Sequence, residues 1–189
     1  MLSSRRRDRS RPVEQQAWEA AGVSGELTPE SVLVSVMNTG GNKLDQFVSV
    51  DGAIEADSGG SGAAVTMRLD ITNDAPVGEP PYVLGPFPGT GLGEGVYRGI
   101  VAVEVPGAAT DVRIEGGEGQ VAAGPDGPAR VIATTAQLAR GERRRVTIRF
   151  RLPATVDELL IEPSARQPPI RWHWGDRTWV DDHAERLEW

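Results

Sequence analysis

The chain has 189 residues, a formal net charge of −7 and no cysteine. This length predicts one domain with appendages, or at most two small domains. The missing cysteines exclude a disulfide framework, a zinc–thiolate site and a cysteine nucleophile. The negative net charge argues against a folded domain that binds nucleic acid or anionic lipid. No uninterrupted apolar run of about 18 residues occurs, so the sequence predicts no membrane insertion.

Residues 1–27 are predicted to form a basic tail followed by a short helix. Five arginines lie between Arg5 and Arg11, and such a run is typical of a solvated or interaction tail. Pro12 is suited to the first turn of a helix, and good helix formers follow it. Gly22 is a plausible end of that helix.

From Ser31 onward the apolar residues recur with a period of two, which predicts strands. In the segment 63–73, Val65, Met67, Leu69 and Ile71 fall on one face, as expected for a half-buried antiparallel strand. Arginines occupy the outward positions of 143–152 and indicate a solvated sheet face. The predicted strands are 31–38, 47–57, 63–73, 97–106, 111–117, 129–138, 143–153 and 157–163.

Two segments are predicted to be connections. Residues 73–95 hold five prolines and six glycines, which excludes the middle of a sheet. Long connections in compact domains often carry function. Residues 116–129 are predicted to form the end of a hairpin with a Pro-Asp-Gly turn.

The strands predict an all-β fold, namely an antiparallel two-sheet sandwich of immunoglobulin-like size with a short N-terminal helix. The sandwich is assigned to residues 28–163. Residues 164–189 hold four of the five tryptophans and both histidines. They are predicted to form a terminal hairpin, turning at Gly175-Asp176, and a tail that packs on the sandwich.

The stretch "NTGGNKLDQF" is the first candidate binding site. It contains Asn42, Asp45 and Lys43, the only lysine of the chain. The amide, the charges and the neighbouring glycines suit a carbohydrate or an anion. The alternative is a turn between strands, with Asn42 capping backbone groups and Lys43 paired with Asp45.

Trp172 and Trp174 are the second candidate, because indole rings form flat platforms for sugars. The alternative is that both rings pack and close the sandwich. The histidines and carboxylates nearby form no recognised metal or catalytic motif, so no metal, cofactor or catalytic residue is predicted. The glycine-rich "GTGLGEG" is not followed by a helix, which argues against nucleotide binding.

Four motifs in register resemble the C-terminal β-rich region of the bacterial DUF4012 family of uncharacterised envelope proteins. They are "EQQAWEAAGVSGEL", "NTGGNKLDQF", "VTMRLDITNDAP" leading into "EPPYVLGP", and "LLIEPSARQPP", which together span about Val13 to Pro169. Members are typically membrane-anchored, outward-facing proteins, often of actinobacteria, encoded near genes for surface polysaccharides. The chain lacks the membrane helix and the central region of that family.

The resemblance implies an extracytoplasmic module of a membrane-anchored protein. We therefore expect a non-catalytic module that binds a cell-wall or capsular polysaccharide or an envelope protein. An accessory domain of an enzyme acting on lipid-linked polysaccharide and a structural spacer or oligomerisation domain are the alternatives. A true start at Met1 would instead favour the cytoplasm.

Overall fold

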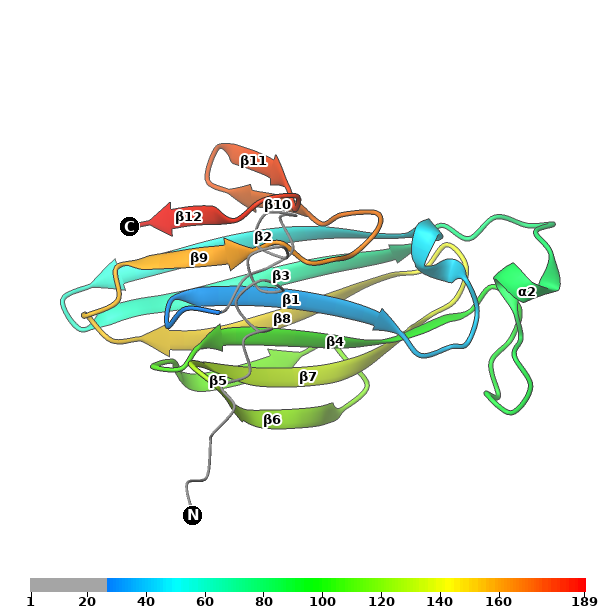
Figure 1. Ribbon diagram of the computed structural model, residues 1–189, viewed down its shortest axis with the longest axis horizontal. Coiled ribbons are helices and arrows are strands. Elements are labelled where there is room, and N and C mark those ends of the chain that lie inside the picture. The colour runs from blue at the N-terminus through cyan, green and yellow to red at the C-terminus, as the bar shows by residue number, and fades with distance from the viewer. Residues whose placement is uncertain (1–26) are drawn as a thin grey trace, which may run out of the picture.

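The computed structural model describes residues 27–189, and the basic tail and short helix predicted before them lie outside the described residues. Two six-stranded sheets pack into a sandwich whose strands run lengthwise (Figure 1). Sheet A has the order β12-β9-β1-β4-β7-β6, and sheet B has the order β11-β10-β2-β3-β8-β5. The predicted all-β sandwich is confirmed.

The strands of sheet A are β1 (Ser31–Asn38), β4 (Tyr97–Pro106), β6 (Gln120–Asp126), β7 (Ala129–Leu138), β9 (Glu158–Glu162) and β12 (Glu185–Glu188). Those of sheet B are β2 (Val48–Gly59), β3 (Gly62–Asn73), β5 (Thr110–Glu115), β8 (Arg143–Leu152), β10 (Arg171–Trp174) and β11 (Arg177–Val180). Two short helices, η1 (Leu44–Phe47) and α2 (Pro81–Leu84), lie in the connections.

Both sheets are mixed, where the sequence predicted antiparallel pairing throughout. Strand β9 pairs with β1 in parallel, and β10 pairs with β2 in parallel. Each of these strands follows a strand of the other sheet, β9 after β8 and β10 after β9. Such parallel pairs need a long connection, which a local pattern does not reveal.

Two strands were not predicted. Strand β6 was assigned to a hairpin end, but it forms the outer strand of sheet A, with nearly all of its residues exposed. An edge strand exposed on both faces lacks the apolar alternation by which strands are recognised, and it tolerates Pro125. Strand β12 has four residues and buries one side chain, Leu187.

The core lies between the sheets and follows the predicted alternation. Val65, Met67, Leu69 and Ile71 of β3 are all buried. On β8 the apolar residues point inward, and the arginines at alternate positions point outward. The last strands, β10 to β12, belong to the sheets themselves, with β10 and β11 in sheet B and β12 in sheet A.

Candidate functional site

All three asparagines of the chain organise one end of the sandwich, where η1 and the loop that carries α2 project (Figure 1). The Asn38 side chain accepts a hydrogen bond from the Gly40 N–H at 2.7 Å. Its Nδ2 donates to the Asn42 carbonyl and side-chain oxygens, at 3.1 and 3.0 Å, and to Asp45 Oδ2 at 2.9 Å. Asn38 therefore fixes the turn and orients Asp45.

The turn is anchored to the rest of the molecule by Asn42 and Gly41. The buried Asn42 amide donates to the Val96 carbonyl at 3.0 Å. Gly41 has φ 75°, and a Cβ there would lie 3.2 Å from Phe87. A side chain at position 41 would therefore strain the backbone and crowd the loop that packs against it.

Asn73 closes the base of the loop that follows β3. It is fully buried, and its amide donates to the carbonyls of Gly95 and Leu138 at 2.9 and 3.0 Å. Its Oδ1 accepts from the Ala75 N–H at 3.2 Å. Both ends of the loop are thus joined through one side chain, so the proline-rich connection has a fixed base.

Helix α2 attaches the outer part of this loop. Val83 and Leu84 are buried, and their carbonyls accept hydrogen bonds from the N–H groups of Lys43 and Gly95, both at 2.9 Å. This anchoring leaves Tyr82, on the other side of the helix, 71% exposed. An aromatic side chain is therefore presented to solvent on a fixed backbone.

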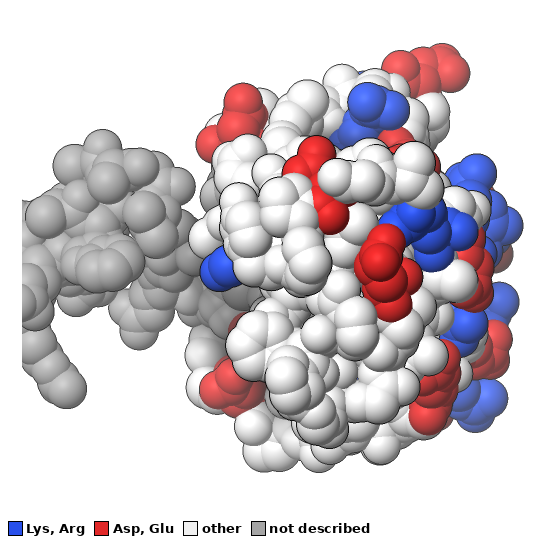
Figure 2. All heavy atoms as spheres, turned by 90° about the vertical axis from the view of Figure 1, so that its right-hand side faces the viewer, with Lys and Arg blue, Asp and Glu red and all other residues white. Residues whose placement is uncertain are grey.

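Tyr82 borders an open depression of about 420 Å³. Its polar lining comes from Lys43, Asp45, Gln46 and Gln167. Three distant segments of the chain therefore supply an amine, a carboxylate, two amides and a phenol. Uncharged side chains cover most of this end of the sandwich, and charges of both signs alternate along its right-hand edge (Figure 2).

Asp45 also influences the pKa values of two buried groups, Tyr97 and Arg166. Burial, and then the charge of Asp45, raise the pKa of Tyr97 to about 12. Burial lowers the pKa of Arg166, while Tyr97 and Asp45 act in the opposite direction. The guanidinium of Arg166 donates to the Val48 carbonyl. The charge of Asp45, which lines the depression, therefore also acts on the buried Tyr97 hydroxyl and Arg166 guanidinium.

The three residues of the first candidate site, Asn42, Lys43 and Asp45, differ in their exposure to solvent. Asn42 is buried in the turn, whereas Lys43 is exposed and Asp45 is half-buried at the depression. Asp45 accepts from Asn38, and no ion pair joins Lys43 to Asp45. The backbone here forms the turn that the alternative interpretation predicted. The Lys43–Asp45 ion pair that the same interpretation predicted does not form.

The tryptophan candidates lie in the packed part of the molecule. Trp172 is 1% exposed, and its ring lies 6.3 Å from that of Trp179, with 21° between the planes. Its indole N–H points to Asp181, at 3.4 Å. Trp174 is half-buried and lies 6.4 Å from the ring of Trp189. Burial favours the packing interpretation for Trp172.

Four residues of the depression were not singled out from the sequence, namely Gln46, Tyr82, Val83 and Gln167. Gln46 lies in the stretch "NTGGNKLDQF", which was the first candidate site. Tyr82 lies in the long connection 73–95, a kind of segment that often carries function. Gln167 carries no local signal, because only the fold brings it to Lys43. The sequence signal for Tyr82 is its aromatic ring, which only Phe87 shares within residues 73–95.

Within residues 27–189 no group of three or more histidine or acidic side chains has an arrangement that could hold a metal ion. The two helices of this part of the chain have four residues each, and neither could cross a membrane. Comparisons with family models, curated proteins and solved structures give no match.

Proposed function

We propose that this protein is a non-catalytic binding module for a surface glycopolymer, and that Tyr82 and the depression beside it hold the sugar. The exposed Tyr82 ring, held beside amide, amine and carboxylate groups, is the observation that carries the proposal. An aromatic face packs against the apolar face of a pyranose ring, while its hydroxyls bond to polar side chains. The depression supplies both kinds of contact.

The open shape of the site suits a polymer better than a small free ligand. Small-molecule sites are concave and bury most of the ligand, whereas this depression is shallow and lies at one end of the sandwich. A chain can pass across such a surface and contact it through one or two sugar units. The resemblance to DUF4012 proteins supports the same ligand class, and an extracytoplasmic location in a membrane-anchored protein belongs to the proposal.

The test is retention of the full chain on purified cell-wall or capsular polysaccharide. Tyr82→Ala and Lys43→Ala are expected to lower retention, whereas Tyr82→Phe, which keeps the ring, should retain most of it. Val121→Ala is the control, because Val121 is 53% exposed on the distant strand β6. Equal retention of Tyr82→Ala and the control, or no retention of the wild type, would refute the proposal.

A protein partner is the second candidate at this end of the molecule. Val77 and Phe87 are 77% and 54% exposed in the same loop as Tyr82. Exposed apolar surface is typical of protein contact sites, and this loop carries two such side chains. Binding of an envelope protein that falls with Phe87→Ala, without any retention on polysaccharide, would favour this candidate over the glycopolymer.

A further inference from the structure

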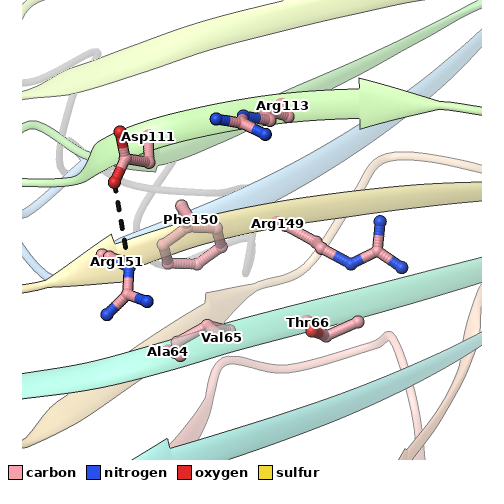
Figure 3. Close-up of a pocket in the computed structure, with 8 residues that line it drawn as sticks. All are labelled: Ala64, Val65, Thr66, Asp111, Arg113, Arg149, Phe150 and Arg151. Carbon is pink, nitrogen blue, oxygen red and sulfur yellow. Dashed lines mark ion pairs between the residues drawn. The ribbon is translucent and has the colours of Figure 1, made fainter.

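A second depression lies on the outer face of sheet B, on different elements from the proposed sugar site. It has a volume of about 350 Å³ and is lined by Arg113 of β5 and by Arg149 and Arg151 of β8. Figure 3 shows these side chains over the two strands, with Asp111 paired to Arg151. Thr66 of β3 adds a hydroxyl to the same lining.

A bulge in β5 is the reason that Arg113 reaches this face. Thr110 pairs with Arg151, but the register shifts by one residue before Arg113, which then pairs with Arg149. Without the shift, Val112 would stand opposite Arg149 and Arg113 would point toward the core. Asp111, within the bulge, has φ 52°, a conformation that aspartate tolerates better than most residues. The bulge therefore re-aims one arginine outward.

The resulting pair is unfavourable for the fold alone. Arg113 and Arg149 stand directly opposite each other, and like charges at such positions destabilise a sheet. An acidic residue at position 113 would have stabilised it. A residue that lowers the stability of the fold at its position is expected mainly at functional sites.

The carboxylates nearby do not balance the three arginines. Glu115 pairs with Arg149 at 2.6 Å, and Asp111 lies 3.8 Å from Arg151. Among residues 27–189, Arg113 forms no ion pair. Three cations therefore face two anions, on a chain whose net charge is −7.

In the other half of the same sheet face, each arginine has a carboxylate partner. Asp70 accepts from both Arg143 and Arg145, at 2.7 to 2.8 Å. Arg68 pairs with Glu55. Among the arginines of this face within residues 27–189, Arg113 is thus the one that has no carboxylate partner. We propose that the depression formed by Arg113, Arg149 and Arg151 binds an anionic group, a phosphate or a carboxylate.

The chemistry of the three side chains defines the ligand. A guanidinium donates two parallel hydrogen bonds to a phosphate or a carboxylate, and two such groups around one depression can share one anion. The Thr66 hydroxyl adds a donor. Because the arginines are exposed, binding is weakened by salt and is specific for the charged group rather than for the whole molecule.

The test compares anion binding by variants of the full chain at constant ionic strength. Inorganic phosphate and glucuronate are titrated separately, and the arginine side-chain N–H signals are followed by NMR. Arg113→Gln is expected to weaken binding about tenfold, the effect of losing one charge-assisted hydrogen-bonding group. Arg143→Gln is the matched control, because it removes the same charge from the half of the face that Asp70 compensates.

The two probes distinguish the possible sources of the anion. Binding of phosphate alone identifies a phosphate site, and binding of glucuronate alone identifies a carboxylate site. Either result supports the proposal when Arg113→Gln weakens binding and Arg143→Gln does not. Equal weakening by both variants would show general attraction to charge and would overturn it, as would binding of neither probe.

A stability measurement separates this role from a structural one. Arg113→Gln removes the repulsion across from Arg149, so the melting temperature of the free protein should stay the same or rise. A lower melting temperature would show that Arg113 supports the fold and would overturn the proposal. Arg113→Lys keeps the charge but loses the planar fork, and its affinity is expected to lie between those of wild type and Arg113→Gln.

Discussion

The packing of Trp172 over Gly52 gives a prediction that ties the C-terminal strand β10 to the centre of sheet B. The two residues pair directly across β2 and β10. A Cβ at Gly52 would lie 2.3 and 2.4 Å from two atoms of the Trp172 ring. Gly52 stands at an inward position of β2, between Val50 and Ile54. The indole ring thus occupies the space that a side chain at position 52 would need.

The magnitudes follow from this geometry. Trp172→Ala should cost about 3–5 kcal/mol of unfolding free energy, because it empties a fully buried site. Gly52→Val should cost at least about 1–3 kcal/mol, because the core cannot accept the added atoms without moving the ring. In the double variant the valine enters the space left by the ring, so the two costs should not add. We expect a coupling energy of about 1 kcal/mol or more in favour of the double variant.

The measurement is urea unfolding followed by far-ultraviolet circular dichroism, which does not depend on the deleted tryptophan. Gly124→Val on β6 is the matched control, because a Cβ at Gly124 meets no atom within 4 Å. This control should change stability little, alone or together with Trp172→Ala. Additivity of Gly52→Val and Trp172→Ala within about 0.5 kcal/mol would refute the packing argument.

Two further predictions concern polar residues. Asn73→Ala should lower the unfolding free energy by about 1–3 kcal/mol, measured in urea, because it leaves the Gly95 and Leu138 carbonyls without their buried donor; an unchanged value would contradict the role of Asn73 as the base of the loop. The Arg145 hydrogen bond lowers the pKa of Asp70 from its ordinary 3.8, so Asp70 contributes stability that is present above about pH 3.8 and lost as the pH falls through the lowered pKa. Asp70→Asn should therefore be less stable than wild type near pH 7 and approach it in acid, and a constant difference from pH 7 to pH 2 would exclude this linkage.

Much of the fold followed from local pattern. The inward positions of β3 and β8 were predicted residue by residue, because alternation of apolar and polar side chains records which face of a strand is buried. The pairing of β9 with β1 was not predicted, since residues about 130 positions apart meet there. The sequence shows a glycine at position 52 but not the reason for it. That reason is the ring of Trp172, which comes from the remote strand β10.

The candidate sites show the same division. Lys43 was selected because it is the only lysine of the chain, and Asp45 as the charge beside it; both line the depression. Tyr82 and Gln167 join them only through the folded arrangement of the loops. The outward arginines of β8 were expected to be a solvated face, and that description holds for Arg143 and Arg145 with Asp70. The opposition of Arg113 to Arg149 depends on a bulge, which alternation does not record.

The placement of the last strands has a consequence for synthesis of the chain. Strands β1 and β2 are the first of the described region to be made, and the partners at one edge of each, β9 and β10, are made after residue 157. During translation these two edges lack their neighbours, and an open strand edge pairs readily with other chains. Soluble yield is therefore expected to depend on how soon the final segment emerges and covers both edges.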